Sequence, residues 1–167
     1  SIARIVALMM GVWFLSIAVA QYVAGVVAQF ASVETVGGEV TNLLIRHGET
    51  AWNAEHRIQG HLDIPLSATG IRQAALLANR LAQETIDAVY SSDLTRARLT
   101  AEPFAARLGL DITLDTRLRE RSFGVFEGLT ADEVSARHPE GFRRWRERDP
   151  AWAIDKGESG QQLIDRV

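Results

Sequence analysis

The stretch VTNLLIRHGET, residues 40–50, decides the fold. Its first six residues are mostly apolar and rich in β-branched side chains, which predicts a buried β-strand ending at Ile45. Arg46, His47 and Gly48 follow directly. In open α/β sheets ligands bind beyond the carboxyl ends of the strands, so the His47 imidazole is placed where it can point into a cleft. This strand and its polar end therefore predict a functional site at one edge of a sheet.

The chain after residue 50 alternates between helical and strand patterns. Helices are predicted at 67–84 with Ser67 as N-cap, from Ser92 or Asp93 to Leu108 with a stop at Gly109, from a capping box at 130–133, and at 140–148; strands are predicted at 86–90 and 112–114, and a loop at 51–66. Strands that alternate with helices of this length predict an α/β fold, with a mostly parallel sheet flanked by helices.

Polar residues follow three of the predicted strands. They are Arg46–His47, Ser91–Ser92 and, further along, Arg119–Glu120. Because parallel strands end at the same edge of a sheet, these residues are expected to meet. The start of the helix after Ser92 also offers free backbone N–H groups to an anion.

The residue types at this edge suit phosphate chemistry. Neutral imidazole is a competent nucleophile toward phosphorus when one ring nitrogen is fixed as a donor and the other is left as an acceptor. Arg46 can present a planar fork to two phosphate oxygens, and Arg96, one turn into its helix, can reach the same anion. Glu120 lies between arginines and can serve either in a structural ion pair or as the proton donor to a leaving alkoxide. Taken alone, an arginine–histidine pair at a strand end is usually an ordinary surface feature.

Several motifs in order along the chain resemble the histidine phosphatase superfamily, which includes cofactor-dependent phosphoglycerate mutase. The matching motifs are Arg46–Thr50 with Trp52–Asn53, Gln59–Gly60, Pro65–Ser67, Ser91–Leu94 with Arg96–Ala97, Glu120–Arg121 with Gly124, and Gly157–Ser159. The resemblance runs from about residue 42 to residue 167. It implies a phosphoglycerate mutase-like α/β fold over this range.

The resemblance also implies roles for individual residues. His47 is expected to be the phosphate-accepting nucleophile and Glu120 the proton donor. The remaining expected phosphate-binding residues are Arg46 and Arg96 as a clamp, Thr50 and Asn53 in the pocket lining, and Gln59 and Gly60 in its outer wall. The resemblance implies no metal and no other cofactor, and His56, His61 and His138 are interpreted as surface or loop residues.

Among the activities of this family, the sequence favours a phosphomonoesterase acting on a small phosphorylated substrate. Mutases of the family carry a longer insertion after the Glu–Arg segment with a tyrosine that holds the acid substrate, whereas here Phe123 stands in its place and the connection from Gly124 to Gly157 is short. The family's second catalytic histidine follows the Gly157–Ser159 motif in a later strand, and this sequence ends at Val167. The expectation is therefore a truncated domain with impaired turnover. The alternatives are a mutase-type phosphotransfer and an inactive membrane fragment or chimera.

The N-terminal part differs from the rest. No residue from Ile5 to Val33 carries a formal charge, and a membrane-spanning helix needs about 20 such residues. We therefore expect a transmembrane helix at 1–34 that contacts the membrane through about 5–33, a linker at 35–41 and the phosphatase domain at 42–167. A buried helix of a soluble domain and a signal peptide are the alternatives. Residues 8–15 and 22–25 resemble a late helix of the proton-dependent oligopeptide transporters. The expected location is the membrane, or the cytoplasm for the phosphatase domain alone.

Composition excludes some classes of function. The net charge of −3 argues against a general nucleic-acid-binding protein, so an anion site must come from a local cluster of basic residues. There are no cysteines, which excludes disulfides and cysteine-nucleophile phosphatases.

Overall fold

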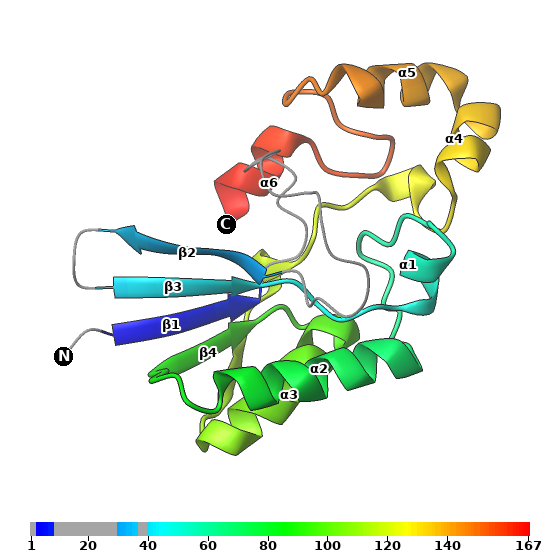
Figure 1. The fold of residues 1–167 in the computed structure, drawn as a ribbon. Coiled ribbons are helices and arrows are strands. Elements are labelled where there is room, and N and C mark those ends of the chain that lie inside the picture. Colours follow the sequence, from blue (N-terminus) through cyan, green and yellow to red (C-terminus); the bar gives the residue numbers. More distant parts are fainter. Residues whose placement is uncertain (1–2, 9–29, 37–39) are drawn as a thin grey trace.

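The computed structural model describes residues 3–8, 30–36 and 40–167, and within them the chain forms a five-stranded sheet with helices packed against it (Figure 1). The strands are β1 (Ala3–Leu8), β2 (Phe30–Val36), β3 (Val40–Ile45), β4 (Ala88–Ser91) and β5 (Ile112–Leu114). The helices are α1 (Ala51–Ala54), α2 (Ala68–Leu81), α3 (Thr95–Leu108), α4 (Ala131–Arg137), α5 (Pro139–Glu147) and α6 (Gly160–Arg166), with short 3₁₀ turns η1 (Thr116–Leu118) and η2 (Gly124–Phe126).

The sheet is mostly parallel, as predicted. Its strand order is β2-β3-β1-β4-β5, and only β2 runs antiparallel to its neighbour. Strand β1 lies between the two strands that lead to the predicted site, since Val6 is in register with Leu43 of β3 and with Val89 of β4. The α/β fold with a mostly parallel sheet is confirmed.

The prediction of one transmembrane helix over residues 1–34 is wrong at both ends. Residues 3–8 and 30–36 are the strands β1 and β2. A strand of a parallel sheet reads as a continuous apolar run, and such a run cannot be distinguished from a helical segment by periodicity. Among the residues that the structure describes, no helix has the length and apolar character that crossing a membrane requires. The middle of the predicted helix, 9–29, lies outside those residues.

The predicted linker at 35–41 is strand at both of its ends. Residues 35–36 belong to β2 and residues 40–41 to β3, and the two strands pair antiparallel with Thr35 opposite Thr41. Residues 37–39 lie outside the described part. The segment therefore joins two paired strands of one sheet instead of separating two units.

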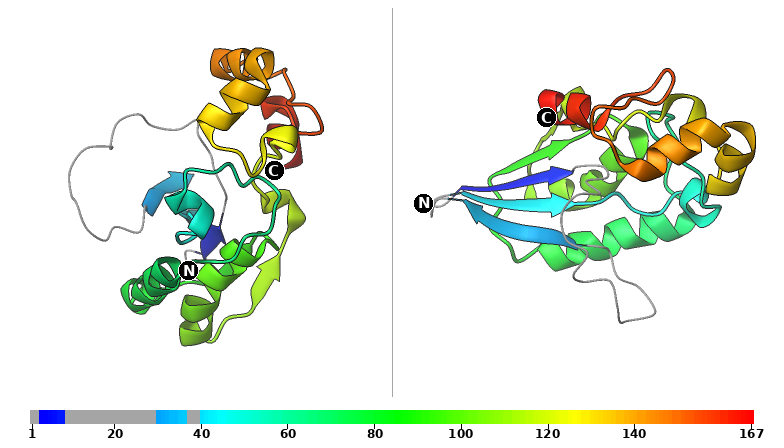
Figure 2. Two further views of the ribbon diagram at one scale, coloured as in Figure 1. Left: turned by 90° about the vertical axis from the view of Figure 1, so that its right-hand side faces the viewer. Right: turned by 90° about the horizontal axis from the view of Figure 1, so that it is seen from above.

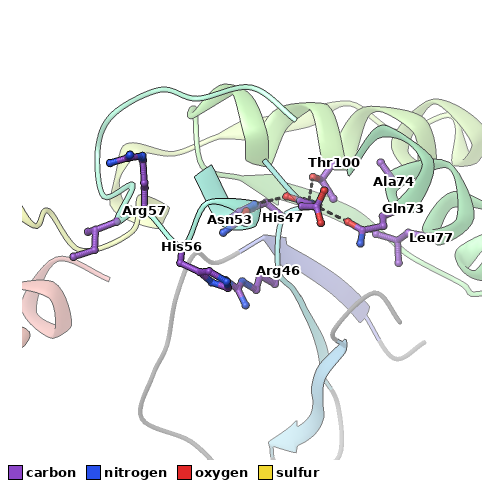
Figure 3. Close-up of a pocket in the computed structure, with 12 residues that line it drawn as sticks. Arg46, His47, Asn53, His56, Arg57, Gln73, Ala74, Leu77 and Thr100 are labelled. Atoms are coloured by element: carbon purple, nitrogen blue, oxygen red, sulfur yellow. Dashed lines mark hydrogen bonds between the residues drawn. The ribbon is translucent and has the colours of Figure 1, made fainter. Parts of the chain in front are cut away.

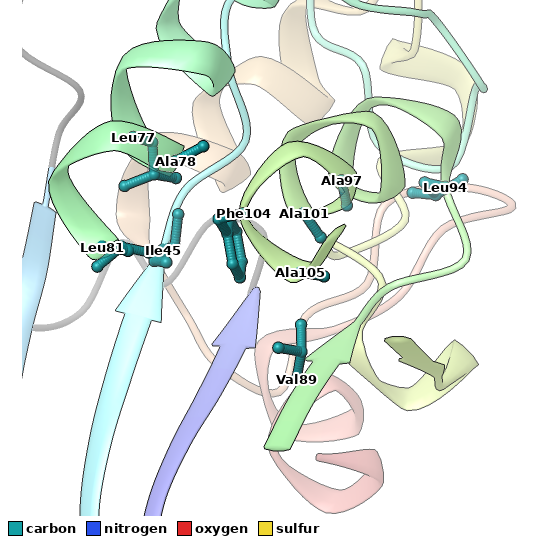
Figure 4. Packing of buried hydrophobic residues seen from close by; sticks show 10 residues of the cluster. All are labelled: Ile45, Leu77, Ala78, Leu81, Val89, Leu94, Ala97, Ala101, Phe104 and Ala105. Atoms are coloured by element: carbon teal, nitrogen blue, oxygen red, sulfur yellow. The ribbon is translucent and has the colours of Figure 1, made fainter. Parts of the chain in front are cut away.

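Helices α2 and α3 cover one face of the sheet and enclose the main core (Figure 4). Phe104 of α3 is fully buried and lies between Ile45 of β3 and Val89 of β4, which are 3% and 1% exposed. Leu77 and Leu81 of α2 close the cluster from the other side. The core therefore fixes β3, and with it His47, against both helices.

A second, smaller cluster holds the segments after residue 120. Phe126, Val134 and Ile154 are buried there, and Trp145 of α5 packs edge-on against Phe126 with ring centroids 5.8 Å apart. Figure 2 shows α4, α5 and α6 gathered on the side of the sheet away from α2 and α3. These elements place the Glu120 segment over the carboxyl ends of the strands.

The predicted helix ends are largely confirmed. The Ser67 hydroxyl accepts from the Gly70 N–H, Gly109 ends α3 in the left-handed conformation at φ 68°, and Thr130 and Glu133 form the capping box of α4. The predicted loop at 51–66 contains one short helix, α1, which Thr50 and Asn53 cap in the same reciprocal way. Because that helix has only one turn, it carries no periodic signal.

Gly70→Ala is expected to lower the free energy of unfolding by about 3 kcal/mol. A Cβ at this position would lie 2.1 Å from the Glu49 carbonyl oxygen, so α2 would have to move away from the turn after His47. Gly109→Ala is the matched control, because it has left-handed backbone but open space around the new Cβ and should cost about 1 kcal/mol. Urea unfolding of both variants measures the difference. Equal losses would contradict the close approach at Gly70.

Candidate active site

His47 leaves the end of β3 with its imidazole buried and its tautomer fixed. The residue is 8% exposed, and Nδ1 lies 2.6 Å from the Gly48 carbonyl oxygen. A carbonyl can only accept, so Nδ1 carries the proton and Nε2 keeps its lone pair. This is the arrangement that the sequence required for a nucleophilic imidazole.

The surroundings of His47 keep it neutral. Burial lowers the pKa of His47 from 6.5 to about 3, the Gly48 hydrogen bond opposes this shift, and the positive charges of Arg96 and Arg46 add to it. Each effect acts on the charged form of the ring. The imidazole therefore keeps its Nε2 lone pair throughout the physiological pH range.

The turn after His47 is held from two helices. The Gly48 N–H donates to Thr100 Oγ1 of α3 at 2.9 Å, and the Glu49 N–H donates to Gln73 Oε1 of α2 at 2.8 Å. A Cβ on Gly48 would lie 2.7 Å from the Gly70 carbonyl oxygen, so only glycine allows this approach. The sequence analysis missed Thr100 and Gln73, because no local pattern links either of them to the turn.

Thr50, Asn53 and Gln59 form a connected polar group beside the turn. The buried Thr50 hydroxyl lies 2.9 Å from Gln59 Oε1 and 3.0 Å from Asn53 Oδ1. Asn53 Oδ1 also accepts from the Thr50 N–H. Since its oxygen serves the cap of α1, the Asn53 amide nitrogen is the group that can donate to an oxyanion.

Arg96 is fully buried and held by the loop before α2. Its terminal nitrogens donate to the carbonyl oxygens of Leu62 at 2.8 Å and Gly60 at 2.6 Å. Its Nε is buried without a hydrogen-bond partner among the residues that the structure describes. A buried donor of this kind costs free energy unless a ligand satisfies it, and an anion would do so. Burial lowers the pKa of Arg96, and the charges of Glu120 and Asp63 oppose that shift.

Glu120 lies against Arg96 with its carboxyl group largely buried. Oε2 is 3.4 Å from an Arg96 terminal nitrogen, and the side chain is 18% exposed. Burial raises the pKa of Glu120, while the charges of Arg96 and Arg46 work in the opposite direction. The sequence left open an ion pair or a proton donor. A long contact with Arg96 and a raised pKa fit a carboxyl group that can carry and release a proton.

A cavity of about 520 Å³ opens beside His47 (Figure 3). Of the predicted site residues, Arg46, His47 and Asn53 line it, together with His56 and Arg57. Thr50, Gln59, Gly60, Arg96 and Glu120 are not in its wall. The two groups nevertheless lie close to each other, because the positive charge of Arg96 lowers the pKa of His47 and that of Arg46 lowers the pKa of Glu120.

The predicted anion site at the start of α3 is already occupied by a side chain. Asp63 accepts from the Thr95 N–H and from the Thr95 hydroxyl, both at 2.7 Å. This carboxylate accepts from the first N–H of α3 and comes from a distant segment, which sequence spacing does not reveal. Positive charge therefore reaches His47 from the Arg96 and Arg46 side chains.

The other histidines have different surroundings. His61 donates from Nε2 to the Glu120 carbonyl oxygen at 2.7 Å, and the His138 ring packs on Phe126 with centroids 5.7 Å apart. No group of three or more His, Cys, Asp or Glu side chains in the described ranges is arranged to hold a metal ion. His61 is thus tied to the active-site segment, a role that the sequence analysis missed.

Comparisons with known proteins agree with this geometry. Residues 42–167 match the sequence profile of the histidine phosphatase superfamily (branch 1). A relative from Escherichia coli O1:K1, described as "Probable phosphoglycerate mutase GpmB", is 45% identical over 128 residues, which cover 74% of this chain and 58% of the relative. This chain thus spans less than two thirds of the length of such relatives.

Solved structures resemble the same part of the chain. A mycobacterial glucosyl-3-phosphoglycerate phosphatase in complex with VO3 is 40% identical with a TM-score of 0.68, and the match covers 73% of this chain and 58% of that one. The alpha-ribazole phosphatase from Shigella flexneri is 31% identical with a TM-score of 0.69, covering 73% and 60%.

Proposed function

Since this chain belongs to the histidine phosphatase superfamily (branch 1), we propose that it is a phosphomonoesterase in which His47 takes a phosphate group from a small phosphorylated substrate and passes it to water. The observation that carries the proposal is the state of His47. Its Nδ1 proton is fixed on the Gly48 carbonyl, its Nε2 keeps the lone pair, and burial lowers its pKa to about 3. Relatives described as phosphatases and as a mutase support phosphate transfer as the reaction class.

The first step of the proposed reaction forms a phosphohistidine. His47 Nε2 attacks phosphorus, the bond from phosphorus to the ester oxygen breaks, and Glu120 gives its proton to the leaving alkoxide. Arg46, Arg96 and the Asn53 amide stabilise the charge on the phosphoryl oxygens, and Arg96 Nε, a buried donor without a hydrogen-bond partner among the described residues, is available to this anion.

The second step returns the site to its starting state. Water attacks phosphorus while the Glu120 carboxylate accepts a proton from it, and the bond from phosphorus to Nε2 breaks. Inorganic phosphate leaves, His47 is neutral again and Glu120 is again protonated. Burial raises the pKa of Glu120, which favours the protonated form that the first step needs, while the charges of Arg96 and Arg46 favour the carboxylate that the second step needs.

A phosphatase fits the segment after Glu120 better than a mutase does. Phe123 packs edge-on against Trp145 with ring centroids 6.2 Å apart. The position that holds a tyrosine hydroxyl in the mutases thus carries an apolar ring that is part of the second cluster. Mutase-type transfer remains the second candidate because of the "Probable phosphoglycerate mutase GpmB" relatives, and it predicts isomerisation of phosphoglycerate.

The experiment is hydrolysis of p-nitrophenyl phosphate by the whole chain in the presence of a chelator, with phosphoglycerate isomerisation measured in parallel. We expect chelator-insensitive hydrolysis without isomerisation. Arg96→Lys should lower kcat/KM by about 100-fold, because lysine cannot replace the planar fork or the Nε donor. Arg98→Lys, two residues along the same helix with its side chain paired to Glu102, should leave kcat/KM unchanged. Hydrolysis that requires a metal, or equal activity of the two variants, would contradict the proposal.

A further inference from the structure

Glu127, which follows the turn η2, binds two separate segments of the active site with one carboxylate oxygen. Its Oε1 accepts from the His61 N–H at 3.1 Å, from the Phe123 N–H at 2.9 Å and from the Ser122 hydroxyl at 3.2 Å. Ser122 and Phe123 come just after Glu120, whereas His61 belongs to the loop before α2. Three donors thus converge on a single carboxylate oxygen, and hydrogen bonds to a charged acceptor are stronger than those to a neutral one.

The same carboxylate packs against the turn that holds Arg96. A Cβ on Gly60 would lie 2.1 Å from Glu127 Oε1, and Gly60 has a left-handed backbone at φ 53°. The Gly60 carbonyl oxygen accepts from Arg96 at 2.6 Å. The position of the buried Arg96 guanidinium thus depends on the Gly60 turn, which packs against the Glu127 carboxylate.

A second tie joins these segments at Glu120 itself. The His61 ring donates to the Glu120 carbonyl oxygen at 2.7 Å, and Arg166 of α6 donates to the same oxygen at 2.9 Å. Arg166 is in turn held by Glu158, at 2.6 Å, within the Gly157–Ser159 motif. The backbone at Glu120 is therefore fixed from the loop before α2 and from α6.

We propose that Glu127 is a positioning residue for phosphate transfer, which holds the Gly60–His61 turn against the Ser122–Phe123 segment so that Arg96 and Glu120 face His47. The proposal rests on the phosphatase function above. Glu127 touches neither the phosphate nor the leaving group in this scheme and acts through Arg96 and Glu120.

The charge of Glu127 adds a second consequence. Burial and the negative charge of Glu127 both raise the pKa of Glu120, against the positive charges of Arg96 and Arg46. The backbone contacts from His61 and Arg166 act on the Glu120 carbonyl and not on its carboxyl group. Removing the Glu127 charge lowers the pKa of Glu120. Glu120 must be protonated to act as the proton donor. As the pH is raised, the variant therefore loses activity at a lower pH than the parent chain does.

The test compares two substrates across pH in chelator. Glycerol phosphate releases an alkoxide that needs a proton, whereas p-nitrophenyl phosphate releases a stable phenolate that does not. Glu127→Gln should lower kcat/KM for both substrates because Arg96 is displaced, should lower it about tenfold more for glycerol phosphate because Glu120 is also affected, and should shift the alkaline limb of the glycerol phosphate profile to lower pH. A second variant serves if Glu127→Gln does not fold. His61→Ala removes the hydrogen bond from the His61 ring to the Glu120 carbonyl oxygen but keeps the Glu120 carboxyl group, and it should show the same larger loss for glycerol phosphate.

Glu133→Gln is the matched control. Glu133 also joins two segments, since it caps α4 and pairs with Arg57 at 2.8 Å, but its charge does not act on Glu120. It should lower the melting temperature without changing the ratio of the two activities or the alkaline limb. In one outcome the parent chain hydrolyses both substrates while Glu127→Gln keeps the parent's ratio of the two kcat/KM values and its alkaline limb. This result overturns the positioning role and leaves the phosphatase function standing. If the parent chain hydrolyses neither, both are overturned.

Discussion

We expect the replacement of His47 by glutamine to abolish the proposed phosphate transfer, with kcat/KM falling by about 10⁴ or more, because the proposed reaction then loses the atom that forms its covalent intermediate. Glutamine is close in size and can still donate to the Gly48 carbonyl oxygen, which His47 Nδ1 contacts at 2.6 Å. It offers no ring nitrogen as a nucleophile. The loss therefore reports on chemistry and not on the packing of the turn.

Acid-labile phosphate labelling measures the intermediate directly. The parent chain, mixed with a labelled phosphomonoester and quenched in base, should retain label that mild acid releases, as a phosphorus–nitrogen bond requires. His47→Gln should retain none. His138→Gln is the control, because the His138 ring packs on Phe126 and does not line the cavity beside His47. Label that survives in His47→Gln would assign the nucleophile to another residue.

The second large effect concerns stability in acid. In the folded chain the pKa of His47 is about 3, against an ordinary value of 6.5, so between these values the unfolded chain binds one more proton than the folded chain. The contribution of neutral His47 to the free energy of unfolding is complete above pH 6.5 and is lost as pH falls toward 3. At about 1.4 kcal/mol per pKa unit, the loss amounts to about 3 kcal/mol between pH 7 and pH 4, and to about 4–5 kcal/mol in full.

His47→Gln should therefore be less sensitive to acid than the parent chain. Urea unfolding at pH 7 and pH 4 gives the difference for each protein, and the parent should lose about 3 kcal/mol more than the variant. Carboxyl groups titrate over the same range in both proteins, so their effect cancels in the comparison. Parallel losses would show that His47 takes up a proton near its ordinary pKa and is not desolvated in the folded chain.

The sequence predicted those parts of the fold that local contacts determine. Ser67 caps α2, Gly109 ends α3 and Thr130 begins α4, and in each case the partner lies within a few residues along the chain. Residues 3–8 were wrongly assigned to a helix because their place depends on β3 and β4. An apolar run of six residues is compatible with either structure until its neighbours are known.

The same distinction applies to the site. Arg46, His47 and Arg96 could be singled out because each follows a predicted strand or begins a helix. The groups that hold them could not, since Thr100 reaches Gly48, Gln73 reaches Glu49 and Asp63 reaches Thr95 across long sequence separations. Hydrogen bonds between distant segments leave no spacing in a single sequence.

The position of β1 in the sheet has a consequence for how the chain folds. Residues 3–8 lie between β3 and β4, with Ile5 paired to Asn42 on one side and to Ala88 on the other. During synthesis β1 leaves the ribosome long before β4, so its second edge stays without its partner until residues 88–91 have emerged. Parallel pairing between distant segments is slow, and an unpaired apolar strand is prone to associate with other chains. Chaperones that bind extended apolar segments should therefore raise the yield of folded protein, and slower translation between β3 and β4 should lower it.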